Sequence, residues 1–331
     1  MSIHNRLRAE AIAIAAIAFL PLAVAPAKAA DYPQRPIKIV IAFGPGGATD
    51  LTTRELARQL QSKLGQTVVI ENKPSAGSIV AMQAVATAAP DGYTLIIGTP
   101  AGFSVTPYLF KTVPYNARDF VPIAPISAMP NVVVAKPDYP VSSLSELVKR
   151  AKGKSASASV TYGSFGTGTT SHLAMEMFRS ATGVEAMHVP YKGDAPALIA
   201  IKSKEVEVAV ITMFTAQSRI ATGELKGLGV LQARPSRVMP SLQTAAQAGA
   251  AEVDLPSWLA LFAPPKTPKA ITDKLEVAVR SVLNTPEFQD FLLKHGSEPL
   301  TGSNKEFLAM IDKQSALLSA KIRELKLVGE E

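Results

Sequence analysis

The sequence contains no cysteine, a single tryptophan and four histidines among its 331 residues. Without cysteine the protein has no disulfide bonds, no thiol nucleophile and none of the zinc sites that rely on thiolate ligands. His172, His188 and His295 do not have the spacing of a metal-binding motif. The sequence therefore predicts neither a metal site nor a covalent crosslink.

The sequence also lacks a run of basic residues and, beyond its N-terminal segment, any apolar run long enough to cross a membrane. Its formal net charge is +7, and its 34 Lys and Arg residues are scattered among 27 Asp and Glu residues. Scattered positive charge is a poor match for nucleic acid, which binds to concentrated basic patches. Small anionic molecules remain plausible ligands.

Motifs of common enzyme classes are absent too. The chain has no G-x-S-x-G elbow, no H-E-x-x-H pair and no glycine loop that ends in Gly-Lys-Ser or Gly-Lys-Thr. Gly166-Thr167-Gly168 begins like a dinucleotide-binding fingerprint, but Ser171 stands where the third glycine belongs. We therefore expect no catalytic residues and no cofactor, and a secreted enzyme acting on carboxylates is the less favoured alternative.

Residues 1–29 have the pattern of a secretory signal peptide. Two arginines precede an almost wholly apolar stretch, and residues 27–29, Ala-Lys-Ala, match the A-x-A cleavage pattern. A retained membrane anchor is the competing interpretation, but the apolar run is short and Pro21 interrupts it. We expect cleavage after Ala29, a periplasmic protein of about +5 formal charge, and no membrane insertion after cleavage.

Predicted strands alternate with predicted helices along the rest of the chain. An apolar strand at residues 37–43 leads through Gly44-Pro45-Gly46-Gly47 into a helix at residues 51–64. This alternation is typical of βαβ units with parallel strands and predicts an α/β protein. Further strands are expected at residues 68–71, 94–98, 158–162, 185–189, 206–211, 228–231 and 253–263, and C-terminal helices at about residues 268–283, 286–294 and 304–325.

Residues 163–172, with the sequence GSFGTGTTSH, follow one of these strands and open into another helix. Glycine permits a close approach of the backbone to a ligand. A helix N-terminus with free N–H groups is an anion-binding site that needs no arginine. A tight turn capped by serine or threonine is an equally good interpretation of this stretch when it is taken alone.

Two segments indicate where the chain crosses between two domains. Residues 113–140 are rich in proline between short apolar runs, and residues 253–263, VDLPSWLALFA, mark the return. We predict a discontinuous first domain, residues 30–129 plus 254–331, and a second domain, residues 130–253. Each domain is expected to be a mostly parallel sheet flanked by helices, with a ligand cleft between the two lobes of a monomer.

Six motifs occur in order along the chain: YPQRPIKIVIAFGPGGATD at residues 32–50, ENKPSAG at 71–77, APDGYTLIIGTP at 89–100, YGSFGTGTTSHLAMEMF at 162–178, HVPYKGDAPAL at 188–198 and SWLALFAPPKTP at 257–268. Taken together, they resemble the Bug family, the substrate-binding proteins of tripartite tricarboxylate transporters. The resemblance covers essentially the whole mature sequence, which makes it more specific than any single glycine loop.

This resemblance implies a two-lobed periplasmic binding protein of the type II fold. Such a protein captures a small carboxylate, either a di- or tricarboxylate or an aromatic carboxylate, and delivers it to the subunits of a membrane transporter. A ligand-presenting partner of a membrane sensor is the alternative. In the family, the loop matching residues 163–172 holds one ligand carboxylate, and the loop matching residues 43–50 closes over it.

The expected ligand-binding residues come from these two loops and from neighbouring strand ends. Two of them have structural alternatives: His172 as a hydrogen-bond partner of the loop backbone, and Asp50 as the cap of a helix that starts near residue 51. The expected set is Phe43, Gly46, Gly47, Thr49, Asp50, Thr99, Ser164, Phe165, Thr167, Gly168, Thr169, Thr170, His172, Tyr191 and Thr212.

Two positions depart from the family pattern. Ile211-Thr212 stands where the family commonly has an Asp-Asn pair, and the loss of the acidic group favours a carboxylate ligand without an amine. Asp194 stands where the family often has a small polar residue. This carboxylate either caps the helix that follows it or repels an anionic ligand.

Overall fold

The computed structural model describes residues 32–152 and 160–327. From Pro33 onward, the described residues form one compact unit. The predicted signal peptide at residues 1–29 lies outside the described part of the chain. Within the described ranges, none of the helices combines the length and the apolar character that a membrane span requires.

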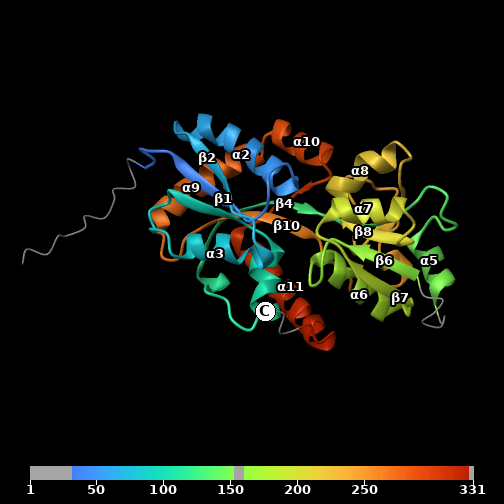
Figure 1. Ribbon diagram of the computed structural model, residues 1–331. Coiled ribbons are helices and arrows are strands. Elements are labelled where there is room, and N and C mark those ends of the chain that lie inside the picture. The colour runs from blue at the N-terminus through green and yellow to red at the C-terminus, as the bar shows by residue number, and fades with distance from the viewer. Residues whose placement is uncertain (1–31, 153–159, 328–331) are drawn as a thin grey trace, which may run out of the picture. The chain divides into compact units, whose positions relative to one another are not determined.

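The first sheet has six strands in the order β11-β4-β10-β3-β1-β2. β1 pairs in parallel with both β2 and β3, whereas β10 runs antiparallel to β3 and β4. The sheet is therefore mixed, with a parallel half and an antiparallel half (Figure 1). Its strands are β1 (Ile37–Ile41), β2 (Val68–Asn72), β3 (Thr94–Gly98), β4 (Val121–Met129), β10 (Ser257–Ala263) and β11 (Glu298–Pro299).

β4 is a nine-residue strand in the segment whose prolines we took as the mark of a crossing. Proline cannot donate a hydrogen bond to a neighbouring strand, so it is found in sheets mainly at edges and bulges. Pro122 pairs with Phe262 and Pro125 with Ala260, and the register of β4 against β10 shifts beside both pairs. These bulges explain how an interior strand accommodates two prolines.

Helices cover both faces of the first sheet (Figure 1). On the face of α3, η3 and α11 lies an aromatic core that includes Phe103, Trp258, Phe262 and Phe307. α2 contacts α9 and α10, and these three helices form the layer on the other face. The helices are α2 (Ala48–Leu64), α3 (Ile79–Ala86), α4 (Thr106–Leu109), α9 (Lys269–Leu283), α10 (Pro286–Lys294) and α11 (Asn304–Glu324), with a π-helix, η3 (Ala101–Val105).

The second sheet has five strands in the order β7-β6-β8-β5-β9. β6 is parallel to β7 and β8, and β5 is antiparallel to β8 and β9. One hydrophobic cluster lies under α5 and α6, and a second lies under α7 and α8. The elements are β5 (Asn131–Ala135), β6 (Val160–Ser164), β7 (Ala186–Pro190), β8 (Val208–Thr212), β9 (Lys226–Val230), α5 (Leu144–Ala151), α6 (Thr170–Thr182), α7 (Asp194–Lys202) and α8 (Met213–Ala221).

The carboxyl ends of the parallel strands in both sheets lie at the edge where the chain passes from one sheet to the other. In the first sheet, Gly98 at the end of β3 pairs with Ala260 near the start of β10. In the second sheet, Thr212 at the end of β8 pairs with Asn131 at the start of β5. Loops that follow these strands therefore start from the two edges next to the crossing segments, where ligands of open α/β sheets bind.

The strands of the first sheet come from residues 37–129 and 257–299, and those of the second sheet from residues 131–230. The C-terminal half of α11 also packs against elements of the second sheet. Leu318 and Ile322 share a hydrophobic cluster with Tyr162 of β6 and Phe178 of α6. The division into domains at residues 129 and 254 remains a prediction.

Replacing Trp258 with phenylalanine tests the packing of the first sheet. The indole Nε1–H of Trp258 donates to Oε1 of Gln314 on α11 at 2.7 Å in a buried environment. Phenylalanine removes this donor and leaves a buried amide oxygen without its partner, so the free energy of unfolding should fall by about 1–3 kcal/mol in denaturant titrations. Val277→Ala, at a side chain that is 71% exposed on α9, is the control and should change stability by less than about 0.5 kcal/mol.

Candidate functional site

The first predicted loop, residues 43–50, connects β1 to α2. The helix begins at Ala48, three residues earlier than the sequence pattern predicted, and Gly47 is its N-cap. Asp50 therefore lies in the first turn of the helix, and the prediction that it could be the cap is wrong. The reason is that the extended backbone of Gly47 already ends the loop, so the helix starts directly after the glycines.

The Asp50 carboxylate orders this loop. It is 2% exposed and accepts hydrogen bonds from the Gly46 N–H at 3.0 Å, from Nε of Arg54 at 2.8 Å and from Nδ2 of Asn72 at 3.0 Å. Burial tends to raise the pKa of Asp50, but the hydrogen bonds from Arg54, Gly46 and Asn72 outweigh it and lower the pKa. Asn72 also donates to the Phe43 carbonyl at 2.9 Å, so β2 and α2 together fix the loop.

The exposed side of this loop presents backbone rather than side chains. Gly46 and Gly47 are exposed, and a Cβ built on either of them would meet no atom within 4 Å. Within the described ranges, the N–H groups of Ala48 and Thr49 in the first turn of α2 have no hydrogen-bond acceptor. Phe43, at the start of the same loop, is 40% exposed. The loop thus offers free backbone donors and an exposed apolar ring.

The second predicted loop, residues 163–172, connects β6 to α6 and is held by its own side chains. Thr169 is the N-cap of α6, and its Oγ1 donates to the Gly166 carbonyl at 2.6 Å. The Phe165 N–H donates to Oγ of Ser171, and the Gly166 N–H donates to Oγ of Ser164. The capped turn that we considered as an alternative is present, and it uses only part of the loop's donors.

Other donors of this loop remain unused. In the part of the chain that the structure describes, the N–H groups of Thr167, Thr170 and Ser171 have no acceptor. Thr170 and Ser171 form the first turn of α6, where the helix dipole adds partial positive charge. Anion binding at this helix start is therefore compatible with the Thr169 cap.

The buried side chain of His172 holds the backbone of loop 163–172 through a hydrogen bond. Its side chain is 4% exposed, and Nδ1 accepts a hydrogen bond from the Gly168 N–H at 3.1 Å. The acceptor role requires a neutral ring that carries its proton on Nε2. The His172 ring stacks on His188 with centroids 3.9 Å apart, and Nε2 of His188 lies 2.7 Å from Oγ of Ser164. This is the structural role that the sequence left open for His172.

Burial keeps both histidines neutral. Burial and, to a smaller extent, the cation of Arg179 lower the pKa of His172 to about 4. Burial, with His172 next to it, also lowers the pKa of His188 to about 4. Arg179 is held by both oxygens of Glu176 at 2.7 and 2.8 Å. Neither histidine is therefore an ionised partner for an anion at neutral pH.

Contacts with elements of the first sheet also position the loop. Gly168 has a φ of +73°, and a Cβ there would lie 3.0 Å from Leu109 of α4, so the backbone approach requires glycine. Oγ1 of Thr170 lies 2.8 Å from Oγ of Ser257 at the start of β10. No sequence pattern marked Leu109 or Ser257 as partners of this loop, since their contacts arise only from the packing of distant segments.

The remaining predicted residues lie at the ends of neighbouring strands. Thr99 follows β3 and is buried, and β3 is adjacent to β1, which leads into loop 43–50. The Tyr191 N–H donates to the Ser164 carbonyl at 3.0 Å, but the Tyr191 hydroxyl donates to Glu205. Thr212 ends β8 beside β6. Within the described residues, no hydrogen bond or ion pair joins loop 43–50 to loop 163–172.

Asp194 does not cap the helix that follows it. α7 begins at Asp194 itself, with Gly193 as N-cap. Oδ2 of Asp194 instead accepts three hydrogen bonds at the start of α8: from the Thr212 N–H at 3.3 Å, from Oγ1 of Thr212 at 2.6 Å and from Oγ1 of Thr215 at 2.7 Å. Oδ1 is buried and has no partner among the described residues.

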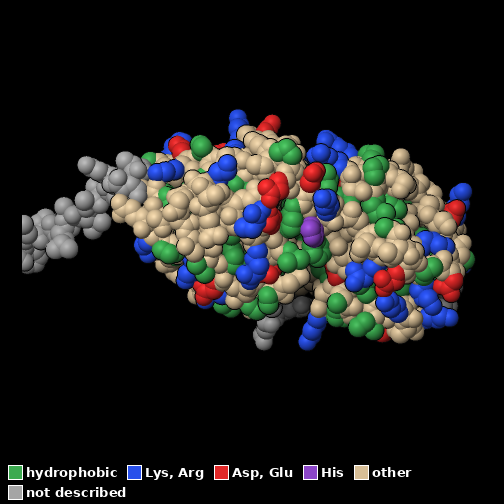
Figure 2. Space-filling view, turned by 90° about the horizontal axis from the view of Figure 1, so that it is seen from above, with side chains coloured by type: hydrophobic (Ala, Val, Ile, Leu, Met, Phe, Trp, Pro, Cys, Tyr) green, Lys and Arg blue, Asp and Glu red, His purple; other side chains and the backbone are tan. Residues whose placement is uncertain are grey.

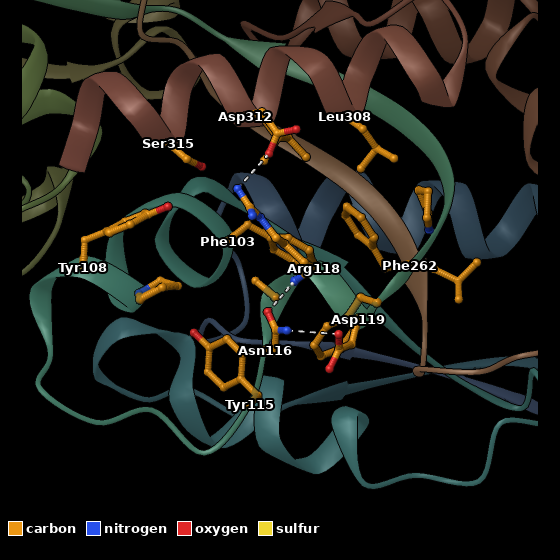
Figure 3. Close-up of a pocket in the computed structure, with 16 residues that line it drawn as sticks. Phe103, Tyr108, Tyr115, Asn116, Arg118, Asp119, Phe262, Leu308, Asp312 and Ser315 are labelled. Carbon is orange, nitrogen blue, oxygen red and sulfur yellow. Dashed lines mark hydrogen bonds and ion pairs between the residues drawn. The ribbon is translucent and has the colours of Figure 1, made fainter. Parts of the chain in front are cut away.

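A cavity of about 600 Å³ lies apart from both loops, between residues 103–122 and α11 (Figure 3). Phe103, Tyr115 and Phe262 contribute aromatic walls, and none of the predicted ligand-binding residues lines it. Its single cation, Arg118, forms an ion pair with Asp312 at 3.5 Å. The cavity thus has no uncompensated positive charge for a carboxylate.

On the face seen in Figure 2, Lys and Arg side chains are spread over the surface with Asp and Glu side chains among them. Among the described residues, no cluster of three or more His, Asp or Glu side chains is arranged to hold a metal ion. Unpaired backbone N–H groups at the starts of α2 and α6 add partial positive charge near the crossing segments.

Two helix-flanked sheets, with strand ends gathered where two segments connect them, define the class of periplasmic binding proteins. Within this class, the chain belongs to the family described as tripartite tricarboxylate transporter family receptor, whose profile matches residues 52–327. Proteins of this family bind solutes and are not enzymes. The resemblance to Bug proteins in the sequence is confirmed by this match and by the solved structures described next.

A UPF0065 protein of Bordetella pertussis is 48% identical over 301 residues, which cover 91% of this chain and 92% of the relative. The periplasmic binding protein BugD is 30% identical with a TM-score of 0.75, covering 90% of this chain and all of BugD. An R. palustris protein solved with adipate is 30% identical, with a TM-score of 0.77 and coverages of 88% and 98%. MatC from Rhodopseudomonas palustris, solved with bound malate, is 26% identical, with a TM-score of 0.73 and coverages of 88% and 100%.

The neutral histidine pair predicts acid sensitivity. Because the folded-state pKa of His172 and His188, about 4, lies below the ordinary value of 6.5, the unfolded chain takes up protons first as the pH falls. Stability should therefore be fully present above about pH 6.5 and be lost progressively between pH 6.5 and 4. Thermal unfolding temperatures measured across this range should fall with pH.

His172→Asn provides the matched variant, because its amide oxygen can still accept the Gly168 N–H but cannot titrate. The dependence of its unfolding temperature on pH should be shallower than that of the wild type. An equally steep dependence would show that other groups cause the acid sensitivity.

Proposed function

We propose that this protein is a periplasmic solute-binding protein that holds a small carboxylate between loop 43–50 and loop 163–172 and delivers it to a tripartite membrane transporter. The main ligand donors are the backbone N–H groups of both loops. Of the other residues predicted from the sequence, Asp50 and His172 position these loops, and Thr212 donates to Asp194. The two groups of strands act as lobes of a monomer, divided near residues 129 and 254. Secretion through cleavage after Ala29 belongs to the same proposal.

The free N–H groups at the starts of α2 and α6 carry this proposal. A carboxylate gains charge-assisted hydrogen bonds from such groups and a favourable interaction with the helix dipole, about 0.3–1 kcal/mol at an exposed terminus and up to about 2 kcal/mol when partly buried. Two termini on different sheets suit a ligand with a carboxylate at each end. Related proteins solved with adipate and malate hold dicarboxylates, which supports the same ligand class here.

The ligand class is further narrowed by what the loops lack. Loop 43–50 holds one carboxylate, Asp50, and this group is fully engaged by Gly46, Arg54 and Asn72. Ile211 is buried in the core under α7 and α8 and offers no acidic group to a ligand amine, and the nearby Asp194 carboxylate is engaged by Thr212 and Thr215. We infer a carboxylate without an amine. Thermal-shift measurements with mono-, di- and tricarboxylates beside aspartate and glutamate should show stabilisation by a carboxylate, while preference for an amino acid would contradict this.

Proline at the first position of each helix removes one backbone N–H donor without destabilising the helix, because that N–H has no partner within the helix. Ala48 and Thr170 are these positions, and the residues before them, Gly47 (φ −85°, ψ 175°) and Thr169 (φ −72°, ψ 165°), already have the extended backbone that proline requires. Ala48→Pro and Thr170→Pro should each raise the Kd of the preferred carboxylate about tenfold in calorimetric titrations, because one hydrogen bond to a charged group is lost.

Matched variants keep the N–H group. Ala48→Ser retains the donor of α2, and Thr170→Val loses only the hydroxyl that contacts Ser257. These controls should bind nearly as the wild type does, with unfolding temperatures close to those of the proline variants. Unchanged affinity in both proline variants would remove the helix termini from the site.

Binding without turnover is expected for the wild-type protein. The ligand that gives the largest thermal shift should be recovered chemically unchanged after prolonged incubation, as judged by NMR of the mixture. Conversion of that ligand would replace the proposal with an enzymatic function.

Crosslinking in membranes of the native host should capture integral transporter subunits. Capture of a sensor kinase alone would show that the protein presents its ligand to a sensor and not to a transporter.

A further inference from the structure

The start of α8 differs from the starts of α2 and α6 because it already holds a carboxylate from the chain itself. Oδ2 of Asp194 accepts the Thr212 N–H at the N-cap position and the hydroxyl groups of Thr212 and Thr215. Asp194 also stands in the first turn of α7. A single carboxylate therefore offsets the partial positive charge of two helix N-termini.

This occupied terminus lies beside loop 163–172. β6 and β8 are adjacent parallel strands that pair Gly163 with Ala209, so Ser164 and Thr212 end neighbouring strands at the same edge of the sheet. Neighbouring strands are about 4.8 Å apart. The Tyr191 N–H, three residues before Asp194, donates to the Ser164 carbonyl. The Asp194 carboxylate therefore belongs to the group of strand ends that supplies the proposed binding site.

The carboxylate is not arranged to maximise stability. A carboxylate can accept about four hydrogen bonds, yet the three bonds of Asp194 all go to Oδ2, and buried Oδ1 has no partner among the described residues. Burial raises the pKa of Asp194, although the bonds from Thr212 and Thr215 act in the opposite direction. A buried acceptor left without a partner in a native protein calls for an explanation other than packing.

We propose that Asp194 is a specificity residue that fills the N-terminus of α8 and so excludes a ligand carboxylate from it. This inference rests on the proposed function, since it assumes that the ligand carboxylates bind at α2 and α6. A ligand with two carboxylates uses the two free helix termini. A third carboxylate would meet the like charge of Asp194 and find the Thr212 and Thr215 donors already taken.

Glutarate and its 3-carboxy derivative, tricarballylate, form a matched pair of probes that differ by one carboxylate. The wild-type protein should bind glutarate at least tenfold more tightly in calorimetric titrations. Asp194→Ser removes the charge and opens space, and it should improve tricarballylate binding at least tenfold while changing glutarate binding less than threefold. Asp194→Asn removes the charge but keeps the volume and should give an intermediate ratio. Isophthalate and trimesate give the same comparison for a ring-containing ligand.

Asp138→Ser is the control for loss of one negative charge, because Asp138 is exposed on a loop of the second sheet and lies 4.0 Å from Lys136. It should leave the ratio of the two affinities unchanged. Circular dichroism and unfolding temperatures confirm that each variant is folded. An unchanged ratio in both folded Asp194 variants, or equal wild-type affinity for the two acids, overturns the inference while the proposed function stands. Failure of every carboxylate to bind the wild type overturns both.

Discussion

The arrangement of this protein depends on one constraint: the first N–H groups of a helix have no partner inside the helix. In each sheet, parallel strands end at the edge next to the crossing segments, and helices begin directly after the connecting loops. Each of these helix starts must therefore find an acceptor from a side chain, from water or from a ligand. The different solutions at α2, α6 and α8 separate the structural roles from the ligand-binding roles that we propose.

At α2 and α6 the side chains shape the loops without using all of the helix donors. Asp50 holds the Gly46 N–H, and His172 holds the Gly168 N–H, so each buried side chain fixes a glycine that precedes its helix. The first-turn groups of Thr49 and Ser171 stay free within the described structure. The side chains thus fix the conformation of each loop while some backbone N–H groups have no acceptor. Such preorganised donors favour the binding of an anion.

Connections between the sheets support the same edge. Nδ2 of Asn131 donates to the Leu255 carbonyl at 2.7 Å, which joins the outgoing crossing segment to the returning one. The Met213 N–H donates to the Pro130 carbonyl, so the start of α8 is tied to the outgoing segment as well. A movement of the lobes about these segments would change the spacing of the helix starts while leaving each sheet intact.

Local pattern was sufficient for much of the fold. α10 has the predicted bounds Pro286–Lys294, and β3 the predicted bounds Thr94–Gly98, because periodicity and terminal residues act over a few positions. The family profile and the related structures confirm the α/β class that these patterns indicated. The nine-residue strand β4 escaped prediction, since its prolines are tolerated only through bulges against β10, a strand more than a hundred residues away.

The sequence alone determined the alternation of strands and helices, the glycine loops and the family, because these are properties of short segments and of their order. Only the tertiary structure decided what each polar side chain does. Asp50 accepts a hydrogen bond from Asn72, 22 positions away, and Asp194 accepts one from Thr212, 18 positions away. The ring of His172 stacks on that of His188, 16 positions away. The physical reason is that hydrogen bonds and ring stacking need a separation of a few ångströms, and that separation is set by the pairing of strands rather than by neighbours along the chain.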